Sequence, residues 1–68
     1  MRFTVELDRE TDGRWIAEVR ELPGVLAYGL TRAEALAAVK ALALRALADK
    51  IEHGEIGSDV SDLCFLAA

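Results

Sequence analysis

The chain contains no asparagine or glutamine, and it has one residue each of cysteine, proline, methionine and histidine among 68. A single cysteine, Cys64, excludes an internal disulfide. The N-terminus lacks the charged start and apolar run of a signal peptide, so we expect a cytoplasmic protein. The scarcity of Asn, Gln and Met is typical of a heat-adapted source.

Basic residues are a minority, since 8 Lys and Arg stand against 12 Asp and Glu, for a formal net charge of −4. No segment forms the basic stripe that contacts phosphates, so direct nucleic-acid binding is not expected. An acidic surface instead suits a basic protein partner, because opposite fields steer association. No apolar run approaches the roughly 20 residues of a membrane-spanning helix, and no membrane association is expected.

Few residues could support catalysis. Glu6 and Asp8 share the polar face of the first expected strand, where a metal-dependent nuclease or hydrolase would need further carboxylates to bind Mg²⁺. A solvated strand face is the favoured interpretation. His53 falls in the last helical turn, where a protonated imidazole favours the helix dipole, and Cys64 is expected to be a small buried hydrophobe. One His and one Cys are too few ligands for a metal, so we predict no catalytic residue, metal or cofactor.

The first thirty residues predict a three-stranded antiparallel meander. Polar and apolar residues alternate over residues 2–8, which is typical of a half-buried strand. Asp12-Gly13 is a hairpin signal before a second strand at 15–20. Pro23 and Gly24 then force a turn, because proline holds φ near its turn value and glycine accepts positive φ. A third strand follows over 25–28.

A helix is predicted from Arg32 to about His53, because the segment is rich in Ala and Leu and has no internal Gly or Pro. Thr31 and Glu34 form a capping box at its start: Thr31 accepts from the Glu34 N–H while the Glu34 side chain reaches back to the Thr31 N–H. Gly54 can take the left-handed conformation that ends a helix.

The apolar residues of this helix cover roughly 240° of its circumference, against the roughly 100° that one sheet contact requires. The stripe expected to face the sheet comprises Ala35, Leu36, Val39, Leu42, Ala43 and Ala46. A second stripe comprises Ala33, Ala37, Leu44, Leu47, Ala48 and Ile51. We predict an interface there, formed by Leu44, Leu47, Ile51, Ala37 and Ala33, in a homodimer or higher homo-oligomer or with another protein. The alternative is that these leucines are tolerated at the surface.

The apolar run near the C-terminus predicts a fourth strand over 60–68. A helix between two strands places them parallel through a right-handed crossover. We therefore expect one α+β domain over residues 1–68, with the element order β-β-β-α-β. If the last strand lies beside the first, the strand order is 3-2-1-4 with the helix on one face.

The ordered motifs of the chain closely resemble the HicB-like antitoxin domain. The motifs are a strand followed by Asp12-Gly13, then Ala17-Glu18-Val19, Glu21-Leu22-Pro23-Gly24, Gly29, Thr31, Glu34-Ala35-Leu36 and His53-Gly54-Glu55-Ile56. The resemblance implies a fold similar to part of the ribonuclease H fold, without its catalytic carboxylates. It also implies an antitoxin that binds a small basic HicA-type toxin, an mRNA interferase, and covers its active site.

Two further expectations follow from this resemblance. Full-length HicB antitoxins usually continue into a DNA-binding domain, so the chain would be a stand-alone form that does not bind an operator. In this family the catalytic histidine belongs to the toxin, so the resemblance implies no catalytic role for His53. Two alternatives are a minimal metal-dependent nuclease on a ribonuclease H-like scaffold, and a purely structural homo-oligomer.

Overall fold

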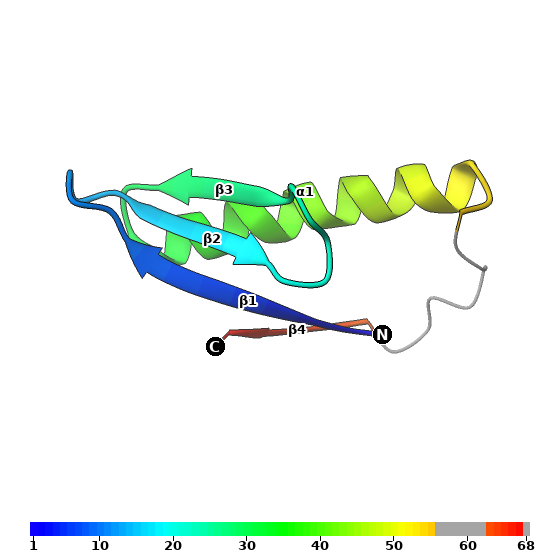
Figure 1. The fold of residues 1–68 in the computed structure, drawn as a ribbon, viewed down its shortest axis with the longest axis horizontal. Coiled ribbons are helices and arrows are strands. Elements are labelled where there is room, and N and C mark those ends of the chain that lie inside the picture. The colour runs from blue at the N-terminus through cyan, green and yellow to red at the C-terminus, as the bar shows by residue number, and fades with distance from the viewer. Residues whose placement is uncertain (56–62, 68) are drawn as a thin grey trace.

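Alternating polar and apolar residues build β1 (Arg2–Arg9), an inner strand of a four-stranded sheet (Figure 1). In the computed structural model, which describes residues 1–55 and 63–67, Phe3 and Val5 are buried while Glu6 is exposed. Successive side chains of a strand point to opposite faces. One face of β1 therefore supplies the core and the other faces solvent, as the alternation predicts.

The other strands complete a mixed sheet. β2 (Trp15–Val19) and β3 (Leu26–Gly29) form an antiparallel meander with β1, and β4 (Cys64–Ala67) pairs parallel with β1. The order β3-β2-β1-β4 confirms the predicted 3-2-1-4 order and the α+β class. The predicted fourth strand is confirmed at residues 64–67, whereas 60–62 and 68 lie outside the described residues.

The two predicted turns have the expected geometry. At the first, Gly13 has φ +93° and the Asp12 carboxylate accepts from the Arg14 N–H at 3.0 Å. At the second, Gly24 has φ +88° and the Val25 N–H donates to the Leu22 carbonyl at 3.0 Å. Positive φ at the third position is the signature of a type II turn, with proline preceding it. Local sequence therefore determines both reversals.

The helix α1 (Arg32–Glu52) begins with the predicted N-cap but only half of the predicted capping box. The Thr31 hydroxyl accepts from the Glu34 N–H at 3.1 Å. The Glu34 carboxylate, however, accepts from the Leu30 N–H at 3.0 Å and not from Thr31. Leu30 follows the end of β3, where its N–H leaves the strand ladder and requires another partner. The prediction for the reciprocal bond was therefore wrong by one residue.

The C-terminal end of α1 is a complete Schellman motif. Gly54 has φ +70°, its N–H donates to the Ile51 carbonyl at 3.1 Å, and the Glu55 N–H donates to the Lys50 carbonyl at 2.8 Å. These two bonds satisfy carbonyls that a helix end leaves unpaired. Within the described ranges, no helix has the length and apolarity needed to cross a membrane.

The core lies between one face of the sheet and α1, which packs mainly against β2 and β3 (Figure 1). Its buried residues are Phe3, Val5, Ala17, Val19, Leu22, Ala35, Val39, Ala43 and Leu47. The burial of Leu47, which is only 4% exposed, contradicts its predicted place in an exposed interface. Leu47 continues the row of Ala35, Val39 and Ala43 at spacings of four, and residues four apart share a helix face.

The orientation of β4 also corrects a prediction. Cys64 is exposed, although it was expected to be a buried hydrophobe. Parallel pairing aligns Phe65 with Phe3 and Cys64 with Arg2. The two phenylalanine rings stack with centroids 5.6 Å apart on the core side. Because alternate residues point to opposite faces, Cys64 and Leu66 lie on the other side of the sheet.

Candidate interaction surfaces

Most of the residues that the sequence predicts for an interface lie exposed on the outer face of α1. Ala33, Ala37, Leu44 and Ile51 are exposed, with 47% of Leu44 and 39% of Ile51 accessible to solvent. Leu47 is the exception because it belongs to the core. Four of the five predicted residues thus lie at the surface, but whether they bind a partner stays a prediction.

The residues exposed along this face follow a heptad spacing. Ala37, Ala41, Leu44, Ala48 and Ile51 are separated by four, three, four and three positions, and all are exposed. This alternation aligns residues along one side of a helix, as in the a and d positions of a coiled coil. We name these five residues the outer helix seam. The interface predicted from the sequence omitted Ala41 and Ala48, although the spacing that identifies them can be read from the sequence.

A second surface lies on the side of the sheet opposite α1, which we call the open sheet face. Its side chains follow from the strand registers, which pair Ile16 with Tyr28 and Glu18 with Leu26. Leu26 is 37% exposed and Tyr28 is 44% exposed. Ile16, Leu26 and Tyr28 therefore form an apolar corner on β2 and β3. This corner could not be identified from the sequence, because its three residues are brought together only by the register between β2 and β3.

Two carboxylates face each other beside this corner. The register of β1 and β2 places Glu6 directly opposite Glu18. The Arg20 guanidinium forms an ion pair with Glu6 at 2.9 Å, whereas Glu18 makes no ion pair or side-chain hydrogen bond with the described residues. Like charges directly opposite each other in a sheet are destabilising. Glu18 is therefore an exposed carboxylate without a compensating cation in the described part of the chain.

At the edge of the apolar corner, the Arg14 guanidinium lies over the Tyr28 ring. The Arg14 guanidinium carbon lies 4.6 Å from the centroid of the Tyr28 ring. The Arg14 Nε also pairs with Asp12 at 2.8 Å. The Arg14 backbone N–H, followed by the side chain of Arg14, lowers the pKa of Asp12. This arrangement fixes Arg14 over one side of Tyr28.

A second carboxylate with a displaced pKa lies where β1 and β2 diverge. The Glu21 side chain accepts a hydrogen bond from the Thr4 N–H at 2.7 Å, and this bond lowers the pKa of Glu21. Hydrogen bonding to the charged form of a carboxyl favours that form. Glu21 thus acts as a structural anchor, since it links β1 to the residues that lead into the Pro23–Gly24 turn.

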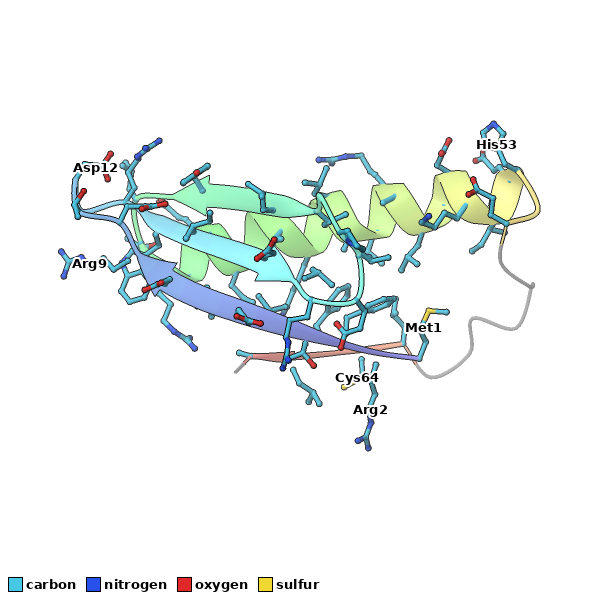
Figure 2. All side chains as sticks on the ribbon, in the orientation of Figure 1. Met1, Arg2, Arg9, Asp12, His53 and Cys64 are labelled. Atoms are coloured by element: carbon cyan, nitrogen blue, oxygen red, sulfur yellow. The ribbon has the colours of Figure 1, made fainter. Side chains whose placement is uncertain are left out.

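The side chains considered for catalysis do not gather at one site in the described part of the chain. Figure 2 shows His53 at one end of the elongated molecule and Asp12 at the other, with Cys64 beside Arg2. His53 follows α1, and its Nδ1 lies 2.7 Å from the Asp49 carbonyl oxygen. Among the residues that the structure describes, no three or more His, Cys, Asp or Glu side chains gather as metal ligands. Glu6 and Asp8 do share the open sheet face, as predicted.

The sheet, the helix and these two exposed surfaces define a small α+β domain. Comparison with protein-family models, with curated proteins and with solved structures finds no match to this chain.

Proposed function

We propose that this chain is a HicB-like antitoxin or an interaction module derived from one, with a fold related to part of the ribonuclease H fold. It binds a small basic HicA-type mRNA interferase and covers its active site. The ordered motifs of the sequence support the family, and the Pro23–Gly24 turn and Thr31 cap have the geometry that those motifs require. The chain acts by occlusion and not by turnover, in the cytoplasm, where an mRNA-cleaving toxin works.

The observation that supports this proposal most directly is the exposed Glu18 carboxylate beside the apolar corner. Glu18 faces Glu6 across β1 and β2, so it is held near a like charge. A cationic side chain from a partner would relieve that repulsion, and this gain would add to the attraction between the two proteins. The carboxylate is thus better satisfied in a complex with a basic protein than in the free chain.

The apolar corner supplies the second requirement of a binding surface. Ile16, Leu26 and Tyr28 are adjacent through the β2–β3 register and lie on the open sheet face. Interfaces commonly combine a buried apolar or aromatic centre with a charged rim. A toxin surface with apolar residues flanked by Arg or Lys fits this combination. Contacts of this kind sterically block the access of RNA to the active site of the toxin.

The test is neutralisation of the HicA-type protein encoded by the reading frame adjacent to the gene. The purified chain is expected to bind this toxin and to abolish its RNA cleavage at equimolar concentration. Glu18→Arg is expected to weaken binding at least about tenfold, which corresponds to about 1.4 kcal/mol. Glu52→Arg, which makes the same change of net charge on the opposite side of the molecule, serves as the matched control.

Two outcomes would contradict the proposal. One is intact toxin activity at saturating concentrations of the chain. The other is Mg²⁺-dependent RNA cleavage by the chain alone that disappears in Glu6→Ala or Asp8→Ala, which would support the nuclease alternative instead. Equal effects of Glu18→Arg and Glu52→Arg would remove the open sheet face from the interface.

A further inference from the structure

We propose that β4 is a strap that detaches from the edge of β1 while the rest of the domain stays folded. In its closed position β4 covers the outer edge of β1 and one side of the Phe3 ring (Figure 1). This motion belongs to the free chain and does not depend on the proposed toxin binding, since it involves only the contacts between β1 and β4.

Few contacts hold β4 in place. The buried core side chains come from β1, β2, α1 and Leu22, and none comes from β4. The main contacts of β4 are with β1, whereas α1 packs against β1, β2 and β3. Within β4 only Phe65 is partly buried, and Cys64, Leu66 and Ala67 are exposed. Detachment of β4 therefore removes no fully buried side chain from the core.

The opposite edge of the sheet is held more firmly. β3 is also four residues long, but it lies against α1, where a Cβ added at Gly29 would be 2.9 Å from the Ala35 Cα. Opening of β3 would therefore separate it from both α1 and β2. Opening of β4 breaks its pairing with β1 and the stacking of Phe65 on Phe3. Segments with few buried apolar contacts open locally at a free energy below that of global unfolding.

Two backbone N–H groups of β1 report on the opening of β4. The Cys64 N–H donates to the Met1 carbonyl at 2.9 Å, where the parallel pairing begins. The direction of the N–H groups alternates along a strand, and the Thr4 N–H points away from β4, toward the Glu21 carboxylate at 2.7 Å. The N–H groups of Phe3 and Val5 therefore point toward β4. They become accessible to solvent when β4 leaves.

The closed strap protects β1 from association with other strands. Once β4 leaves, the outer edge of β1 carries unpaired N–H and C=O groups, and such an edge is a template for pairing with another chain. The Phe3 ring also loses its cover: it is 4% exposed and stacks on Phe65 with ring centroids 5.6 Å apart. β4 thus acts as an intramolecular cover over a backbone edge and an apolar side chain.

The first experiment measures hydrogen exchange of the full chain by NMR at increasing urea concentrations. After correction for intrinsic rates, the N–H groups of Phe3 and Val5 should exchange at least about tenfold faster than those of Ala17 and Val19. The second pair reports on the β3 side of the sheet, since the Val19 N–H donates to the Val25 carbonyl at 3.0 Å. Exchange at Phe3 and Val5 should also depend weakly on urea, because opening of β4 exposes little surface.

The second experiment locks β4 onto β1 with a disulfide. The register pairs Arg2 with Cys64, and Figure 2 shows the two side chains beside each other. Adjacent strands lie about 4.8 Å apart, a separation that a disulfide spans. In the oxidised monomer of Arg2→Cys, the Phe3 and Val5 N–H groups should exchange at least about tenfold more slowly than in its reduced form. Arg2→Cys in a Cys64→Ser background is the control, and the same oxidant should change its exchange by no more than about threefold.

Several results would overturn the inference. Equal protection of the two pairs of N–H groups would show that β4 opens only with the rest of the domain. Exchange at Phe3 and Val5 as fast as in an unfolded chain would show that β4 is not paired with β1. Failure of the disulfide to form in the monomer, or equal exchange in its oxidised and reduced forms, would contradict the detachment of β4 from β1. A failure to neutralise the toxin would leave these exchange rates unchanged, so the two proposals fail independently.

Discussion

Gly29 is the position where one added methyl group should most disturb the fold. It is the last residue of β3 and lies against the first turn of α1. A Cβ at this position would lie 2.8 Å from the Glu34 carbonyl carbon and 2.9 Å from the Ala35 Cα. These are backbone atoms, so they cannot rotate away as a side chain would. Gly29→Ala can be accommodated only if the strand and the helix move apart.

The expected loss of stability follows from two opposing effects. Overpacking a core usually costs about 1–3 kcal/mol, and a backbone contact places Gly29→Ala toward the upper end. The substitution also restricts the unfolded chain, which stabilises the fold by about 0.4–1 kcal/mol. We therefore expect a net decrease of about 2 kcal/mol in the free energy of unfolding. For a domain of this size, that corresponds to a decrease of about 8–16 °C in Tm.

The assay is chemical denaturation at one fixed protein concentration, followed by far-ultraviolet circular dichroism and by the fluorescence of Trp15. Trp15 pairs with Gly29 across β2 and β3, so it reports on the affected region. The double variant with Ala35→Gly is the discriminating control. Removing the Ala35 side chain should not rescue stability, because the clash involves backbone atoms. A loss below about 0.5 kcal/mol, or rescue by Ala35→Gly, would refute the reasoning.

Two other predictions concern the core and the dependence of stability on pH. Leu47→Ala should lower the free energy of unfolding by about 2–5 kcal/mol. Leu44→Ala, at an exposed position, should change the free energy of unfolding of the monomer by about 0.5 kcal/mol or less. Equal effects of the two substitutions in denaturation experiments would contradict the burial of Leu47. The Thr4 N–H lowers the pKa of Glu21 below its usual value of 4.5, so the ionised Glu21 stabilises the fold above that pH. This contribution is lost as the pH falls through the lowered pKa. Glu21→Gln should therefore be less stable near neutral pH and lose less stability on acidification, and an unchanged slope of unfolding free energy against pH would contradict this.

Much of the fold could be predicted because its determinants are local. The Gly13 and Gly24 turns, the Thr31 cap and the helix end at Gly54 each depend on interactions within a few residues. Such interactions are encoded by residue type and spacing alone. The strand order could also be predicted, since hairpins join neighbouring strands and a helix crossover makes the fourth strand parallel to the first.

The prediction of which helix residues are exposed was wrong for Leu47, because a broad apolar helix does not specify its own rotation. Both stripes of α1 were apolar enough to face the sheet. Contact with β2 and β3 placed Leu47 in the core and left Leu44 and Ile51 outside. The heptad spacing of the outer helix seam was visible in the sequence. Whether the seam residues are exposed depends on how the helix packs against the sheet.

The sequence alone determined the elements of this protein, their order and the turns that join them, because these depend on short-range hydrogen bonds and periodicity. Tertiary structure decided which side chains meet. Pairing of Phe65 with Phe3 turned Cys64 outward, in an apolar segment with no alternation to indicate its faces. The register of β1 and β2 likewise placed Glu18 opposite Glu6. Both results depend on contacts between residues distant in the chain, and no local pattern encodes them.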